Sequence, residues 1–255
     1  VYDAWLYALQ PMWTEFGGAY PDFMRSAAWA AKAHQTGFGS YAELKHDTIL
    51  YAKQAFAEGE APLPPAEPRH WVEPDPVAFA RLAAAAQLMR DGLASRDLLT
   101  DEVAGVLDEI IAMYERFARL ARDELAGRPI TSEDNEWLET IGSRFELIWL
   151  LAGDEEQLEG SNMVESPDDI AAVIADIMSN PEEALEIGTG MIDDLYVLVP
   201  NDSGQFQVAR GGVYSYYEFW VPREERLTDE EWRQQVFDGA TPDRPEWQQV
   251  YLAEE

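Results

Sequence analysis

Residues 44–54, LKHDTILYAKQ, hold the sequence's densest mixture of side chains suited to acid–base chemistry. His46 could act as a general base, and Asp47 as an acid or an orienting group. On a helix, Asp47 and Tyr51 would share one stripe, with His46 and Lys53 on the neighbouring face. The same groups could instead form a satisfied buried network between two layers. We expect the network, because no nucleophile motif accompanies these residues.

A second cluster, ARGGVYSYYEF, begins at residue 209. On a strand, Tyr216 and Glu218 would share one face. In so acidic a chain we expect Arg210 to pair with a carboxylate, either Glu218 or Asp176, and thereby to fix the architecture or receive an anionic ligand. A hydrolase would need this cluster to meet the first one in a single concave pocket. Its catalytic candidates would be His46, Asp47, Tyr51, Lys53, Arg210 and Glu218.

Metal and cofactor signals are weak. The three histidines stand at positions 34, 46 and 70 without an HExxH motif, which argues against zinc. Asn201 and Asp202 offer oxygen ligands for Ca²⁺, but the spacing is not that of an EF-hand, and we expect a plain hairpin turn. No GxSxG, Walker or dinucleotide-binding motif occurs. We therefore expect no cofactor, with Ca²⁺ as the alternative.

Acidic side chains outnumber basic ones by 49 to 18, and the net charge is −31. Such a field repels nucleic acids and anionic lipid headgroups, and it attracts cations or basic partners. No run of about 18 apolar residues exists, so we expect no membrane span. The absence of cysteine excludes disulfides and thiolate sites. Trp71 and Trp220 are among the tryptophans that could stack on sugars, although such residues are more often core or interface anchors.

Helix caps and a 3.6-residue periodicity predict a largely helical first part of the chain. Gly37 and Gly39 are expected to break the chain there. Ser40 and Glu43 then form a capping box for a helix over 41–58, which would carry the chemically mixed segment. Further helices are predicted over 2–12, 77–94, 101–126, 131–151, 167–178 and 228–238.

From about residue 186 apolar residues alternate with a period of two, which predicts strands. Gly211 and Gly212 indicate a bulge or a close backbone approach within them. We therefore expect a mainly α protein, a multi-helix domain with a small C-terminal antiparallel β-sheet (α+β). The predicted division is a helical part over 1–184, with a proline-rich loop at 58–76, and a sheet with a C-terminal helix packed on it over 185–255, together forming one structural unit.

Several long stretches resemble one family. They are LKHDTILYAKQAFAE, WVEPDPVAFARL, ADIMSNPEEALEIGTGMIDDLYVLVP, QVARGGVYSYYEFWVP and RLTDEEW. Together, from about Tyr2 to Trp232, the chain resembles the bacterial and archaeal family catalogued as domain of unknown function 3160. The resemblance implies an exported or lipoprotein-type envelope protein. Family members would be longer than this chain, and this chain would match their C-terminal half. The resemblance implies no activity, so no catalytic residue is transferred.

Two features bear on that resemblance. Met178 stands in ADIMSNP where the family often has a histidine, so a site built on that histidine would be missing here. The chain begins at Val1 without an initiator Met, which we interpret as a processed or partial chain. The N-terminal part of the same precursor would then be one candidate partner.

Two functions remain open from the sequence. The first, which we favour, is an extracellular or periplasmic protein, attached to a membrane only through a partner, that serves as a non-catalytic subunit or interaction module of a larger assembly. Its partners would be other polypeptides, with no nucleic acid. The alternative is a secreted hydrolase acting on glycan or peptide, with a site formed by the 44–54 helix and the 210–218 strand.

Overall fold

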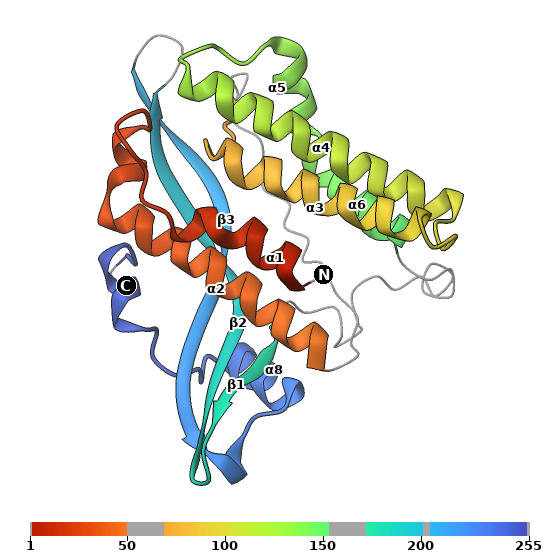
Figure 1. Cartoon of the computed structure of the whole chain (residues 1–255). Coiled ribbons are helices and arrows are strands. Elements are labelled where there is room, and N and C mark those ends of the chain that lie inside the picture. Colours follow the sequence, from red (N-terminus) through yellow and green to blue (C-terminus); the bar gives the residue numbers. More distant parts are fainter. Residues whose placement is uncertain (1, 50–68, 153–171, 201–204, 254–255) are drawn as a thin grey trace. The chain divides into compact units, whose positions relative to one another are not determined.

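A computed structural model describes residues 2–49, 69–152, 172–200 and 205–253 (Figure 1). The chain forms two compact units, each assembled from three segments. The first unit comprises Val1–Pro21, Pro64–Asn162 and Val199–Ala209, and the second comprises Asp22–Leu63, Met163–Leu198 and Arg210–Glu255. The predicted division at 184/185 is a single cut, whereas each unit takes segments from both sides of it.

The first unit is built on helices whose starts are set by capping side chains. The Asp75 carboxylate accepts hydrogen bonds from Val77 N at 3.1 Å and Ala78 N at 3.0 Å, with Pro76 in the first turn. Thr100 caps the next helix by accepting from Val103 N. The helices are α1 (Tyr2–Leu9), α3 (Pro76–Ala94), α4 (Asp101–Leu125), α5 (Ser132–Glu139) and α6 (Ile141–Ala152), with the 3-10 helix η1 (Gln10–Trp13) after α1.

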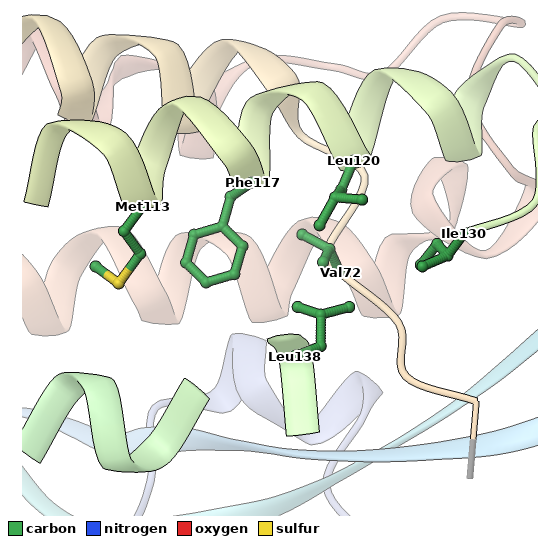
Figure 2. Close-up of a cluster of buried hydrophobic side chains, with 6 residues drawn as sticks. All are labelled: Val72, Met113, Phe117, Leu120, Ile130 and Leu138. Carbon is green, nitrogen blue, oxygen red and sulfur yellow. The ribbon is translucent and has the colours of Figure 1, made fainter. Parts of the chain in front are cut away.

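The core of the first unit is organised by α4. Met113, Phe117 and Leu120 follow one another at spacings of four and three residues, so they form one buried stripe. Figure 2 shows this stripe directed toward Val72 and Leu138, which come from two other segments. The stripe therefore joins α4 to the extended stretch before α3 and to α5.

The predicted helix over 131–151 is two helices. Its start is confirmed, because Thr131 caps α5 by accepting from Asp134 N at 3.1 Å. The helix then ends at Glu139, and α6 begins at Ile141. Thr140 separates the two, and its hydroxyl donates to Trp137 O at 2.9 Å. A hydroxyl that bonds back to the backbone competes with helical hydrogen bonding at such a position.

The second unit holds most of the sheet, because only the end of β2 and the start of β3, within Val199–Ala209, belong to the first unit. Strands β1 (Ile174–Ser179), β2 (Glu183–Pro200) and β3 (Phe206–Pro222) lie in the order β1-β2-β3. In the antiparallel pair of β1 and β2, Ile174 faces Gly188 and Asp176 faces Glu186. The helices here are α2 (Ala27–Ile49), α8 (Asp229–Asp238) and the short 3-10 helices η2 (Asp22–Arg25), η4 (Arg223–Glu225) and η5 (Glu246–Val250). The predicted class, mainly α with a small antiparallel sheet, is confirmed.

Helices α2 and α8 cover opposite faces of this sheet. On one face, Ala42 of α2 packs with Ile187 and Tyr216. On the other, Trp232 of α8 is fully buried and packs with Tyr217. A side chain at Gly188 would meet the Trp232 ring at 3.0 Å, so this position leaves room only for glycine.

Two predicted elements near the site are wrong. Gly37 and Gly39 do not break the chain, because α2 runs through both to Ile49 and Ser40 lies inside it. A side chain at Gly39 would lie 3.5 Å from Thr189 Cγ2, an ordinary van der Waals distance, so α2 packs against the sheet at this position. Tertiary packing thus outweighs a glycine cost of about 1 kcal/mol in a helix.

The predicted helix over 167–178 is also wrong in the part that the structure describes. Ile174–Ser179 form β1, paired with β2. The sequence AAVIADIM suits a buried helix or a buried strand equally by its periodicity, and its β-branched Val173, Ile174 and Ile177 favour the strand. Pairing with β2 decides between the two.

Candidate functional site

His46 lies near the end of α2 and is 3% exposed. Its Nε2 lies 2.8 Å from Asp229 Oδ2, at the first turn of α8. The other carboxylate oxygen of Asp229 accepts from Ile174 N at 3.2 Å. Burial alone would raise the pKa of Asp229, but the hydrogen bonds from His46 and from Ile174 N–H lower it. One carboxylate therefore holds α2, β1 and α8 together.

A second pair of acids lies on the same sheet. Asp176 and Glu186 are opposed residues of β1 and β2. Glu186 is fully buried, and its Oε1 accepts from Leu227 N at 2.8 Å. Arg226 Nη1 donates to Asp176 Oδ2 at 2.8 Å. Burial, together with the charge of the facing Asp176 carboxylate, raises the pKa of Glu186 to about 7.

These five residues form what we call the polar seam. The members are His46, Asp176, Glu186, Arg226 and Asp229. The short stretch 226–229 is tied to the sheet and to α2 by side chains from three other elements. His46, Asp176, Glu186 and the stretch 226–229 all fall within the motifs that carry the family resemblance. The motif LKHDTILYAKQAFAE therefore contributes His46 to a buried contact between α2 and α8.

The seam contains groups that enzymes use, namely a histidine–aspartate pair and two carboxyl groups on opposed residues. A general base must come within hydrogen-bond reach of a substrate proton. His46 and Glu186 are 3% and 0% exposed. The described residues line a groove between α3 and α4 and a cavity beside α6, and neither is lined by a seam residue. The arrangement thus suits a structural joint.

Arg210 and Glu218 have partners of their own. Arg210 is paired with Asp194 across β2 and β3, with Nη2 2.9 Å from Oδ1, and both side chains are exposed. The predicted partners Glu218 and Asp176 are bound elsewhere. Glu218 accepts from Tyr216 Oη at 3.0 Å and from Trp247 Nε1 at 3.1 Å.

The remaining candidates are described less fully. Asp47 lies in α2, but its side chain is outside the described part of the structure, as are Tyr51, Lys53, Asn201 and Asp202. The hydrogen bonds described for the other candidates lead to other residues. His46 bonds to Asp229, Arg210 to Asp194, and Glu218 to Tyr216 and Trp247. Met178 lies on β1 with 54% of its surface exposed. Within the described ranges, no group of three or more His, Asp or Glu side chains could hold a metal ion.

Sequence reasoning missed the roles of Asp176, Glu186, Arg226 and Asp229. A signal was present for Glu186, a lone carboxylate in the strand run LEIGTG. A carboxylate flanked by residues of a buried strand is rarely fully buried unless it has partners. The helix predicted over 228–238 is confirmed as α8, and Thr228 and Glu231 in the motif RLTDEEW form its capping box. Asp229 inside it carried a second role.

The distal part of β2 exposes an apolar surface. Ile192, Tyr196 and Leu198 alternate along β2 and are 51%, 62% and 60% exposed. The Asp194–Arg210 pair lies among them, and Tyr196 Oη donates to Asp194 Oδ2 at 3.2 Å. A side chain at Gly212 would lie 2.7 Å from Ile192 Cγ2, which confirms a close approach at this glycine. We call Ile192, Asp194, Tyr196, Leu198 and Arg210 the hairpin face.

Among the described helices, none is both long and apolar enough to cross a membrane.

No curated protein and no solved structure matches the chain. The model of one family, described as Protein of unknown function (DUF3160), matches residues 1–248. This range is wider than the predicted 2–232, and which part of longer members the chain represents stays a prediction. The chain belongs to the family of unknown function DUF3160.

Proposed function

We propose that this chain is an exported, envelope-associated protein that acts as a non-catalytic subunit or interaction module of a larger assembly. The hairpin face is the surface that would contact a partner polypeptide. The observation that carries the proposal is the exposure of Ile192, Tyr196 and Leu198, each more than half accessible on one strand. The export and the envelope location rest on the acidic composition and the family resemblance alone.

The chemistry of the hairpin face fits a polypeptide partner. Contiguous exposed apolar side chains mark interaction surfaces, and interface centres are poor in unpaired charge and rich in aromatic residues. The face has one tyrosine, two aliphatic residues and a single ion pair whose charges cancel. It offers no cluster of basic side chains, which nucleic acid would require.

The geometry of the strands gives a second reason for a partner. The antiparallel register of β1 on β2 ends at Gly188, four residues before the hairpin face begins at Ile192. Among the described strands, β2 has no neighbour other than β3 beyond that point. A two-stranded ribbon is only marginally stable in water, and a partner that covers its apolar face would stabilise it.

The alternative, a secreted hydrolase acting on glycan or peptide, has less support. It needs His46 to reach a substrate, yet His46 is 3% exposed and bonded to Asp229. It also needs the 44–54 and 210–218 segments to share a pocket. Where the side chains are described, Arg210 is instead paired on the hairpin face with Asp194.

The test uses a triple variant, Ile192→Ser, Tyr196→Ser and Leu198→Ser, beside wild type. Proteins captured from an envelope extract by the wild-type chain are identified by mass spectrometry, and the partner is purified for titration calorimetry. The N-terminal part of the precursor is titrated in parallel. We expect the variant to bind at least about 100-fold more weakly, since losing interface anchors costs about 2 kcal/mol or more each.

The matched control is Leu88→Ser, which removes a side chain 64% exposed on α3. It should leave the affinity unchanged. If the triple variant binds the purified partner as tightly as wild type does, the hairpin face is not the contact surface. If the wild-type chain binds no polypeptide, the interaction function itself is refuted.

A further inference from the structure

A cavity of about 260 Å³ lies within the first unit, and it is lined by no residue of the polar seam or the hairpin face. It is formed by the extended stretch before α3, by α3 and α4, and by the two helices after them. The lining residues are His70, Trp71, Val72, Glu73, Phe79, Phe117, Leu138, Ile141 and Phe145. Its volume is slightly below the range of pockets for drug-sized molecules, so it suits a small ligand.

Aromatic side chains dominate the wall. Trp71, Phe79, Phe117 and Phe145 all line the cavity. The Phe79 and Phe117 rings lie 5.2 Å apart between centroids, at an angle of 34°. Figure 2 shows the Phe117 ring within the buried cluster, between Met113 on one side and Val72 and Leu138 on the other. Aromatic faces carry negative potential and attract cations, most strongly at a tryptophan.

Two polar side chains enter this otherwise apolar wall. The Glu73 carboxylate is one of them. The other is the His70 imidazole, whose Nε2 is buried and has no hydrogen-bond partner in the described part of the chain. His70 is held by its backbone, because its N–H donates to Asn135 Oδ1 at 2.9 Å. A buried ring nitrogen without a partner costs free energy that a bound donor would recover.

The surrounding charges favour a cation over an anion. Two arginines, Arg116 and Arg144, lie over the Trp137 ring at 4.5 and 5.5 Å, and Trp137 does not line the cavity. Each of these arginines is already paired, with Asp134 and Glu109 respectively. Arg69 is close enough to Glu124 to act on its charge. The wall itself therefore presents one carboxylate and no cationic Lys or Arg.

We propose that this cavity binds a small organic cation, an amine or quaternary ammonium group with a compact apolar body. The aromatic rings would surround the charged group, and Glu73 would neutralise it. His70 Nε2 would accept a hydrogen bond from an N–H or hydroxyl of the ligand. A sugar fits less well, because its many hydroxyls would find only two polar side chains on the wall. The site is independent of the proposed interaction function.

The decisive experiment compares choline with 3,3-dimethyl-1-butanol, a neutral molecule of nearly the same shape. Titration calorimetry on the full wild-type chain at low salt measures both. We expect choline to bind at least about tenfold more tightly, because a desolvated cation on aromatic faces gains up to about 2 kcal/mol. Equal affinities, or no binding of choline at tens of millimolar, would overturn the proposal.

Variants locate the site. Glu73→Gln should weaken choline binding about tenfold, and Phe145→Ala, at a partly exposed ring, about threefold to fivefold. Glu115→Gln is the matched control, since it removes the same charge from an exposed position of α4. If Glu115→Gln weakens binding as much as Glu73→Gln does, choline is held by the general acidic field and the cavity is not its site. The wild-type comparison decides the question even if Glu73→Gln does not fold.

Discussion

Asp134 in the first unit and Glu186 in the second are both buried carboxyl groups, yet their pKa values are shifted in opposite directions. Asp134 accepts from Arg116 at 2.7 Å, Arg119 at 2.6 Å and the Thr131 hydroxyl at 2.9 Å. Although burial alone would raise it, these donors lower the pKa of Asp134 to about 2. Glu186 accepts from one backbone N–H and faces Asp176, and its pKa is raised to about 7.

The comparison shows that burial does not decide a carboxyl group's charge. Burial acts in the same direction on both residues, toward the protonated form. For Glu186 burial is the largest cause of the raised pKa and the charge of Asp176 adds to it, whereas for Asp134 the two guanidinium groups outweigh burial. These two carboxyl groups should therefore respond oppositely to pH, Glu186 losing its contribution to stability as the pH rises and Asp134 as it falls.

The larger of these two effects belongs to Glu186. Its ordinary pKa is 4.5, against about 7 in the folded chain. Between these values the unfolded chain releases a proton that the folded chain keeps, so stability falls as the pH rises and the loss is complete above about 7. The difference corresponds to about 3 kcal/mol. Urea unfolding at intervals from pH 4 to 9 measures it.

Glu186→Gln is the matched variant for that experiment. The amide oxygen keeps the acceptor for Leu227 N, and the side chain no longer ionises. Its stability should therefore decline less between pH 4.5 and 7 than that of wild type, and the decline that remains includes the contribution of Glu124, whose pKa burial raises to about 8. Parallel curves for variant and wild type would mean that Glu186 does not titrate in this range.

The second effect belongs to Asp134 and has the opposite sign. Its pKa is about 2 in the folded chain and 3.8 ordinarily. The stability that it contributes is complete above about pH 4 and is lost as the pH falls toward 2, amounting to about 2 kcal/mol. Asp134→Asn should remove this dependence in acid unfolding curves. Asp108→Asn, at an exposed pair with Arg90, should cost at most about 1 kcal/mol.

The sequence predicted the fold better than it predicted these networks. Local signals were sufficient where a cap decides an element, as at Thr131 and Thr228. They failed where a partner far along the chain decides it. Strand β1 forms because it pairs with β2, and α2 continues through Gly39 because it packs against the sheet there. The polar seam could not be predicted for the same reason, because His46 and Asp229 are 183 residues apart in the sequence.

The third effect tests whether the seam is a joint. His46→Gln should cost about 1.5 kcal/mol, the typical contribution of a hydrogen bond to a charged group, because Asp229 would lose its partner on α2. His34→Gln on the same helix is the control, since the His34 ring bonds to Ala30 O within its own helix. Unfolding in urea should separate the two variants. Equal losses would show that the His46–Asp229 contact adds nothing to stability.

The smallest expected effect on stability belongs to the hairpin face, and this contrast separates a joint from a surface. Tyr196→Ser and Leu198→Ser remove side chains that are about 60% exposed, so each should change the free energy of unfolding by no more than about 0.5 kcal/mol. Seam variants should lose stability, whereas face variants should lose partner affinity at unchanged stability. If the face variants instead unfold easily, these side chains support the fold of this chain and do not form a surface reserved for a partner.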